Sequence, residues 1–256
     1  MKILIQFLIR LVPRKVLQKI APWILPLIGR LYRGHNVTCP IIGKSYRKFL
    51  PYGRINPRPN ALCLESMSLE RHRLLWLYLK EKTDFFKTKL RVLHIAPEQC
   101  FIQEFKKQHG GYYVTGDIES PLADVQMDIH QIPFDEGDFD CVLCNHVLEH
   151  VEDDKKAIGE INRVLKKGGW AILQVPFFYP LVDITEEDPT ITDPGMREKR
   201  YGQSDHVRRY GKDYADRIRS QGFKVTEDDY CSTLPEETRT KYALPKDEII
   251  YFCEKI

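Results

Sequence analysis

From residue 90 onward, apolar and polar positions follow strand-like and helix-like patterns in turn. Short apolar runs predict buried strands, and the longer amphipathic stretches predict helices. Alternation of this kind predicts an α/β fold with a mostly parallel sheet covered by helices on both faces. The expected strands are 91–96, 112–117, 139–145, 170–175, 221–225 and 249–253, the expected helices are 100–108 and 153–165, and a turn is expected at 166–169.

The first 33 residues show a different pattern. Polar residues recur every four positions from Lys2 to Gln18 among Ile, Leu, Phe and Val, which predicts an amphipathic helix with a narrow basic stripe. A second apolar stretch, 20–32, is interrupted by two prolines. Neither stretch reaches about 18 uninterrupted apolar residues, so no transmembrane span is expected. Arg10 also interrupts the apolar run that a cleaved signal peptide requires.

Charge is distributed unevenly over the 256 residues. Residues 1–64 hold twelve Lys and Arg and no Asp or Glu, so the net charge of +3 leaves −9 for residues 65–256. Basic residues among Leu, Ile, Phe and Trp favour an interfacial helix on an anionic membrane surface. We therefore expect a cytoplasmic protein attached peripherally to the inner face of the membrane through residues 1–33. Packing of this segment on the protein's own core or at a dimer interface is the alternative, and its Leu and Ile content argues against nucleic acid.

Seven cysteines without regular spacing argue against a disulfide framework and favour a reducing compartment. The segments 39–42 and 63–66 lie where a zinc ribbon would carry two CxxC pairs, but each keeps only its first cysteine. Two thiolates do not complete a tetrahedral zinc site, so we expect a degenerate ribbon without metal. Two unrelated buried cysteines would explain the same residues. Cys141 and Cys144 lie in an expected strand, where packing explains them better than a redox pair.

These patterns divide the chain into three expected parts. Residues 1–34 form the basic amphipathic segment, residues 35–66 form the degenerate ribbon, and residues 67–256 form the main domain. A helix is expected over 60–79, where leucines recur among charged residues.

Several motifs of the main domain occur in a characteristic order. They are 92–98, Asp117, 128–134, 139–140, 146–150 and 163–169. Together they resemble class I S-adenosylmethionine-dependent methyltransferases of the type 11 kind, over about residues 90–180. The segments 39–79 and 201–211 resemble the subgroup that has a zinc-ribbon-like segment before this domain. The resemblance implies a Rossmann-like seven-stranded sheet and S-adenosyl-L-methionine as the cofactor.

The resemblance places the cofactor at the carboxyl ends of the first strands. An acid that ends the second strand, Asp117, accepts hydrogen bonds from ribose hydroxyls, although a turn or helix cap would also use it. Asp128 suits the adenine amino group and Ile129 the ring face, with a turn as the alternative role for Asp128. The first loop departs from the family pattern. Where the family commonly has an acid this chain has His94, and where glycines are common it has Ala96 and Glu98. The expected cofactor contacts are His94, Ala96, Glu98, Asp117, Asp128, Ile129, Asn145 and His146.

The inserted region 176–214 is rich in aromatic and charged residues. We expect catalytic roles for His146 and for Asp205 with His206, which would form an oriented base. Ion pairs of a surface loop would explain the insertion equally well. His146 and His150 have the spacing of a metal pair, but their order is not that of a known motif and no third ligand is evident, so no metal is expected. The expected acceptor contacts are Tyr179, Arg208 and Tyr210.

Three functions fit the sequence to different degrees. The first is a methyltransferase that acts on a small-molecule, lipid-linked or glycan-linked acceptor. The second is a non-catalytic methyltransferase-like scaffold, which the glycine-poor first loop and the broken ribbon favour. The third is a dinucleotide-dependent oxidoreductase, which is disfavoured because no GxGxxG motif follows the first strand.

Overall fold

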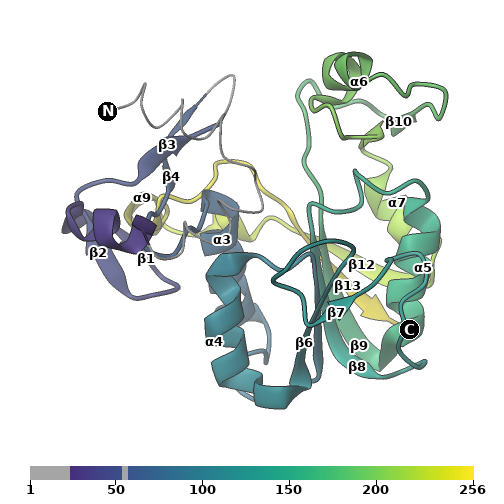
Figure 1. Ribbon diagram of the computed structural model, residues 1–256, viewed down its shortest axis with the longest axis horizontal. Coiled ribbons are helices and arrows are strands. Elements are labelled where there is room, and N and C mark those ends of the chain that lie inside the picture. The colour runs from purple at the N-terminus through teal and green to yellow at the C-terminus, as the bar shows by residue number, and fades with distance from the viewer. Residues whose placement is uncertain (1–23, 54–56) are drawn as a thin grey trace. The chain divides into compact units, whose positions relative to one another are not determined.

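The computed structural model describes residues 24–53 and 57–256, which form two compact units (Figure 1). The first unit comprises the described residues up to Lys82 together with Cys231–Glu248, and the second comprises Thr83–Tyr230 with Ile249–Ile256. The three expected parts of the chain stay a prediction, because this division follows contacts and not sequence pattern.

The second unit is built on a seven-stranded sheet with the order β12-β13-β9-β8-β5-β6-β7. All neighbouring strands run parallel except β13, which is antiparallel to both β12 and β9. This confirms the expected Rossmann-like, mostly parallel sheet. The strands are β5 (Val92–Ile95), β6 (Tyr113–Asp117), β7 (Val125–Gln126), β8 (Phe139–Asn145), β9 (Leu165–Gln174), β12 (Phe223–Asp228) and β13 (Ile250–Lys255).

Helices cover both faces of this sheet, with α4 (Gln99–His109) on one side and α5 (Asp154–Val164) and α7 (Tyr214–Arg219) on the other (Figure 1). A single 3-10 turn, η1 (Gly110–Tyr112), follows α4. Helix α5 begins where the Asp153 side chain accepts a hydrogen bond from the Lys156 N–H. Its apolar positions, which recur at helical spacing, are buried: Ala157, Ile158, Ile161 and Val164.

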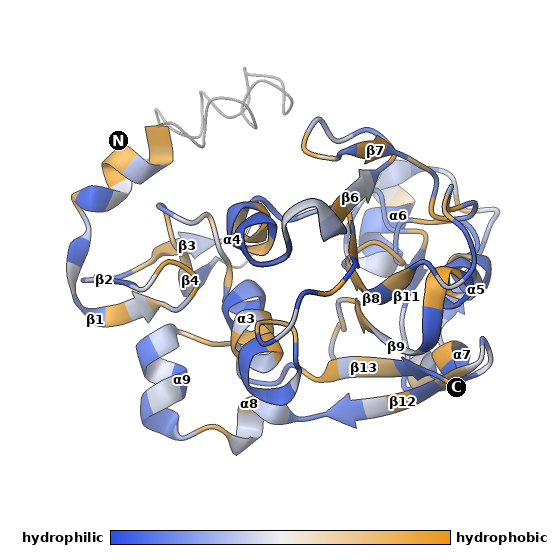
Figure 2. Ribbon diagram, turned by 90° about the horizontal axis from the view of Figure 1, so that it is seen from below, coloured by the Kyte–Doolittle hydropathy of each residue, from blue (hydrophilic) through white to orange (hydrophobic). Residues whose placement is uncertain are grey.

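The central strands carry the core because both of their faces are covered. Every residue of β5 is buried, and six of the seven residues of β8 are buried. The edge strand β12 is mostly blue in Figure 2, whereas its neighbour β13 is mostly orange. Cys141 and Cys144 are free buried thiols of β8, as the packing interpretation expected.

The expected turn at 166–169 is wrong, because these residues belong to β9. The strand begins at Leu165, and its pairing with β8 shifts in register between Phe139 and Cys141. Gly168 adopts φ +75°, a conformation that glycine takes without steric cost. The glycines therefore produce an irregular strand start and no reversal.

An inserted segment follows β9. Strand β10 (Glu186–Glu187) pairs antiparallel with β11 (Arg208–Arg209), and helix α6 (Pro194–Tyr201) lies between them in the chain. Asp193 caps the start of α6, and Gly202 ends it in the left-handed region with φ +89°. The insertion is thus an ordered substructure that returns the chain to α7.

The first unit consists of two small hairpins and helices. A helical segment at 24–30 precedes them, and α8 (Tyr230–Thr233) crosses the boundary between the units. The elements are β1 (Arg33–Cys39) paired with β2 (Lys44–Tyr46), β3 (Leu50–Tyr52) paired with β4 (Arg58–Leu62), α3 (Glu70–Lys82) and α9 (Glu236–Tyr242).

The helix expected over 60–79 starts only at Glu70, so the first ten residues of that prediction are wrong. Asn60 belongs to β4, where its side-chain oxygen accepts a hydrogen bond from the Phe49 N–H at 3.1 Å. The buried Arg73 guanidinium then donates to carbonyl groups of this strand and of α9, including those of Ala61 and Tyr242. These long-range hydrogen bonds override the local helical pattern.

The amphipathic helix expected from Lys2 to Gln18 lies outside the described residues. Within the described part of the chain, no helix has both the length and the apolar character that crossing a membrane requires. The segment at 24–31 exposes four large apolar side chains: Ile24, Leu27, Ile28 and Leu31.

Candidate functional site

The carboxyl ends of β5, β6 and β8 lie side by side at one edge of the sheet. Ile95 pairs with Gly116 of β6 and with Cys144 of β8, so the next residues, Asp117 and Asn145, lie level with the start of the first loop. The strand order reverses between β5 and β8, and ligands of open α/β sheets bind at such a point. The strand ends that carry Ala96, Asp117 and Asn145 therefore lie together.

Two residues at this edge hold conformations that normally favour glycine. Ala96, directly after β5, has φ +49°, and His146, directly after β8, has φ +55°. Their backbone N–H groups donate to the carbonyls of Gly116 at 2.8 Å and Gln174 at 2.7 Å. Left-handed conformations cost a residue with a Cβ about 1–2 kcal/mol, and such strain concentrates at functional sites.

A buried hydrogen-bonded bridge joins the first loop to β8. The His94 ring is fully buried, with Nδ1 2.7 Å from the Tyr113 hydroxyl and Nε2 2.5 Å from Glu98 Oε2. Asn145 Nδ2 donates to Glu98 Oε1 at 3.2 Å. Glu98 therefore stands between two strand ends and fixes the loop that has lost its glycines. Asn145 Oδ1 is buried and has no hydrogen-bond partner in the part of the chain that the structure describes.

The two expected acidic contacts differ in their surroundings. Asp117 Oδ1 accepts hydrogen bonds from the N–H groups of Glu119 and Ser120 at 2.8 and 2.7 Å, which orients the carboxylate and leaves Oδ2 for a ligand. Asp128 is more exposed, and its Oδ1 accepts from the backbone and ring of His130. These hydrogen bonds lower the pKa of Asp128. Both roles foreseen for each acid, turn and ligand contact, are compatible with this geometry.

Ile129 lies beside Asp128 but faces inward. It is 6% exposed and packs in the hydrophobic core of the second unit. Its expected role as a cover for the adenine ring stays a prediction.

Arg208 and Tyr210 are structural in this arrangement, in contrast to their expected place among the acceptor contacts. The Arg208 side chain is 2% exposed and donates four hydrogen bonds, to Glu187 and to the backbone carbonyls of the loop 148–152. The Tyr210 hydroxyl lies 2.9 Å from Asp154 Oδ2 and 3.1 Å from Leu148 O, so its single proton is shared between these two acceptors, and burial raises its pKa. Both side chains hold the loop after β8 in place, so an acceptor does not reach them.

Asp154 completes this buried network. Burial by itself would raise the pKa of Asp154, but the hydrogen bond from Arg217 and the positive charges of Arg208 and Arg217 hold it below its usual value. Arg217 donates to both Asp154 oxygens, at 2.7 and 3.0 Å. The carboxylate is therefore ionised in the folded protein.

Asp205 and His206 do not form the expected oriented pair. His206 is fully buried, and its Nδ1 donates to the Tyr201 carbonyl at 3.1 Å. Asp205 is exposed and lies beside His150 instead, with 3.6 Å between Oδ2 and Nδ1. The two adjacent side chains therefore contact different neighbours. Burial lowers the pKa of His206, which keeps the ring neutral near pH 7.

His146 and Tyr179 remain accessible. His146 follows the strained turn after β8, and its Nδ1 lies 3.5 Å from Glu149 Oε1. Tyr179 is 71% exposed in the segment that leads into the insertion. The sequence left Glu149 and His150 open between orienting the loop after β8 and touching a ligand. It gave no role to the Tyr201 carbonyl, because a backbone acceptor leaves no signal in residue type.

The residues at this edge fit S-adenosylmethionine. One Asp117 oxygen is available to hydroxyl donors, and the buried Asn145 Oδ1 requires a donor such as an ammonium or amide group. The strained turns at Ala96 and His146 bring backbone close to the space at the strand ends.

Comparison with known proteins gives partial matches. Residues 78–173 match the family described as a methyltransferase domain. An uncharacterized 37.1 kDa protein of a Streptomyces fradiae transposon is 39% identical over 57 residues, which are 22% of this chain and 16% of that protein. The ubiquinone/menaquinone biosynthesis C-methyltransferase of Pasteurella multocida is 39% identical over 59 residues, 23% of this chain and 22% of that protein. The chain thus spans less than a third of the length of the curated relatives that it matches.

Among solved structures, an S-adenosylmethionine-dependent methyltransferase from Mesorhizobium loti is 14% identical, with a TM-score of 0.48 over 70% of this chain and 97% of that one. The family match covers strands β5 to β8, nearly all of β9, the loop after β8 and helix α5. Residues 78–173 therefore match a methyltransferase domain, and the cofactor that this match implies is S-adenosyl-L-methionine.

Proposed function

We propose that the protein transfers a methyl group from S-adenosylmethionine to an acceptor. The observation that carries the proposal is the meeting of Ala96, Asp117 and Asn145 at the strand-order reversal of the family's sheet. A non-catalytic scaffold would have no need for two strained turns at this point.

The chain's part in this reaction is binding and orientation. The cofactor supplies an electrophilic methyl group on a sulfonium. Asp117 Oδ2 would accept from the ribose hydroxyls, Asp128 from the adenine amino group, and Asn145 Oδ1 from the amino-acid end. The Glu98 bridge holds Asn145 and the first loop in register. Positioning of this kind supplies much of the rate of a displacement reaction.

We assign the base, where the acceptor has to lose a proton, to His146. Its side chain is part-exposed, and Glu149 Oε1 lies 3.5 Å from Nδ1 and orients the ring. Nε2 is buried and has no hydrogen-bond partner among the described residues, so the ring has to rotate to present this nitrogen to an acceptor. His206 is fully buried and reaches no acceptor directly. Tyr179, at the accessible side, is the proposed acceptor contact.

Calorimetric titration with S-adenosylhomocysteine tests the proposal. Asp117→Ala is expected to weaken binding at least about tenfold, because a carboxylate that accepts from two hydroxyls contributes more than about 1.4 kcal/mol. Asp216→Ala is the matched control, since Asp216 is an exposed partner of Arg219 on α7. A folded protein that takes up no ligand would favour the scaffold instead.

We also propose that the acceptor is a small molecule or a lipid- or glycan-linked group, met at a membrane surface. The exposed apolar side chains at 24–31 and the twelve basic residues of 1–64 support this. Co-sedimentation with anionic vesicles is expected to fall for Leu27→Glu with Leu31→Glu, and to stay unchanged for Ile184→Glu, an equally exposed control. Equal partitioning of all three proteins would remove the membrane proposal.

The segment 35–66 is proposed to be a degenerate zinc ribbon. Cys39 Sγ lies 3.3 Å from Ser66 Oγ and 3.5 Å from Ser68 Oγ, so serine hydroxyls stand where further thiolates would be needed. Hydroxyls are poor zinc ligands beside thiolates, and hydrogen bonds serve in place of a metal. Metal content that stays unchanged in Cys39→Ser would support this assignment.

A further inference from the structure

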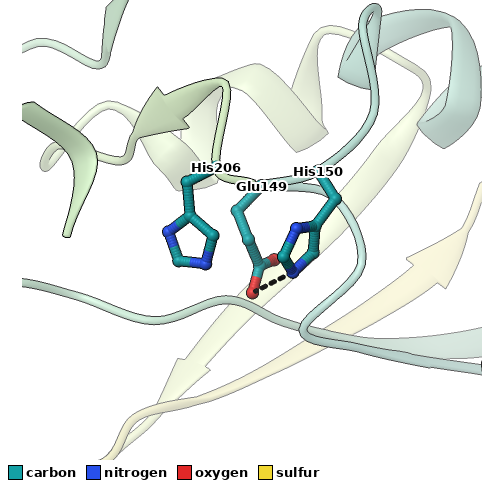
Figure 3. Close-up of side chains that lie close together, drawn as sticks. All are labelled: Glu149, His150 and His206. Atoms are coloured by element: carbon teal, nitrogen blue, oxygen red, sulfur yellow. Dashed lines mark ion pairs between the residues drawn. The ribbon is translucent and has the colours of Figure 1, made fainter. Parts of the chain in front are cut away.

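Glu149, His150 and His206 bring three ligand atoms together beside the loop after β8. One atom from each side chain lies within 4.8 Å of the other two. Figure 3 shows the two imidazole rings on either side of the Glu149 carboxylate. His206 comes from the insertion, 56 residues after His150, so the fold and not local spacing assembles the group.

Backbone hydrogen bonds orient both rings. His206 Nδ1 donates to the Tyr201 carbonyl at 3.1 Å, and His150 Nδ1 donates to the Asp205 carbonyl at 3.2 Å. A neutral imidazole that donates through Nδ1 carries its lone pair on Nε2. Metal-binding histidines have this second hydrogen bond as a rule, because it fixes the tautomer and the ring plane.

The atoms that face the middle of the group lack partners. Glu149 is 1% exposed, and neither its Oε2 nor His206 Nε2 has a hydrogen bond in the part of the chain that the structure describes. His150 Nε2 lies 3.9 Å from Glu149 Oε1. Lone pairs of a buried carboxylate and of two imidazoles repel one another, and an unpartnered buried charge costs several kcal/mol. A cation between them would remove both penalties.

We propose that Glu149, His150 and His206 bind one divalent transition-metal ion. Two imidazoles and one carboxylate are ligands that suit Zn²⁺, Co²⁺, Mn²⁺ or Fe²⁺, whereas Mg²⁺ and Ca²⁺ prefer oxygen ligands. Metal–ligand distances of about 2.1 Å bring ligand atoms to about 3.0–3.4 Å from one another. The three atoms would therefore move inward by about 1 Å, which rotation of the part-exposed His150 ring allows.

The loop that carries two of the ligands is held firmly. Arg208 donates to its carbonyls, and the Val207 N–H, next to His206, donates to the Glu149 carbonyl at 2.9 Å. Three protein ligands leave coordination positions open on the His150 side, where water or an acceptor oxygen would bind. His146 directly follows β8, and its Nδ1 lies 3.5 Å from Glu149 Oε1, so an acceptor oxygen on the ion would stand near the end of β8 and the cofactor; this last step rests on the proposed function.

Metal titration of chelator-treated full-length protein tests the site without any cofactor. We expect one Co²⁺, Mn²⁺ or Zn²⁺ per chain, with affinity reduced at least about tenfold by Glu149→Gln, His206→Ala and His150→Ala. His150 is part-exposed, so His150→Ala tests the site without a change in the core. His35→Ala, an exposed histidine of the first unit, is the matched control and is expected to bind like the wild type.

Three results would overturn the proposal. They are binding of less than one ion per chain, equal binding by the wild type and His150→Ala, and loss of the ion in Cys39→Ser in place of the three ligand variants. The visible spectrum of bound Co²⁺ reports the same outcome, since loss of an imidazole ligand changes its bands. Cofactor binding by the metal-free protein, measured separately, distinguishes failure of this site from failure of the proposed methyl transfer.

Discussion

Replacement of Arg208 by leucine is expected to destabilise the second unit severely. The guanidinium donates to Leu148 O at 2.6 Å, Val151 O at 2.6 Å, Glu152 O at 2.8 Å and Glu187 Oε2 at 2.9 Å, and its side chain is 2% exposed. Its Nε also lies 3.9 Å from Asp154. Leucine supplies none of these donors.

The magnitude follows from what replaces each lost hydrogen bond. In the variant, Leu148 O still accepts a hydrogen bond from the Tyr210 hydroxyl. Glu152 is exposed, so water replaces the lost donor at the Glu152 carbonyl. Val151 O and the buried Asp154 carboxylate lose more, although Arg217 still pairs with Asp154. Removal of one partner of a buried charge network costs about 3–5 kcal/mol. Arg208→Lys is expected to lose about half of this, because an ammonium cannot span the carbonyls of the loop.

Urea unfolding followed by tryptophan fluorescence measures the effect. Arg219→Leu is the matched control, since Arg219 is 43% exposed and pairs with Asp216 and Glu227 at the surface. Exposed pairs contribute less than about 1 kcal/mol. A loss in Arg208→Leu no larger than that in Arg219→Leu would refute the structural role, and would return Arg208 to the acceptor contacts.

Three further predictions concern the site and its surroundings. Glu98→Ala is expected to weaken S-adenosylhomocysteine binding about tenfold in calorimetry, because Asn145 loses its orienting partner. Asp154→Asn is expected to lower the free energy of unfolding at pH 7. The difference from the wild type should begin to shrink as pH falls below about 4 and disappear only below the lowered pKa of Asp154, because the ionised carboxylate is what stabilises the fold. Burial lowers the pKa of His109 to about 4, so wild-type stability should fall between pH 6.5 and 4, and this fall should be smaller in His109→Phe.

The sheet was predictable from the sequence, because apolar runs mark buried strands, and Asp117 and Asn145 end two of these strands. The position of Asp117 and Asn145 at the ends of expected strands was enough to identify them as candidates. The helix start at Glu70 was not predictable, since it depends on the hydrogen bond that Asn60 accepts from the Phe49 N–H and on those that Arg73 donates to distant segments.

The roles of the residues in the insertion could not be predicted from the sequence either. Charged and aromatic residues such as Arg208 and Tyr210 suit an acceptor site as well as a buried clamp, and only burial distinguishes the two. The group of Glu149, His150 and His206 needs a contact across 56 residues. The sequence showed only the pair His146 and His150, of which His150 alone belongs to this group.

A crystal structure of the protein with S-adenosylhomocysteine tests the central claim most directly. The account predicts the ligand at the carboxyl ends of β5, β6 and β8, with its ribose hydroxyls donating to Asp117 and its amino group donating to Asn145 Oδ1. A ligand bound elsewhere, or a first loop that the His94–Glu98–Asn145 bridge keeps closed against it, would contradict the account.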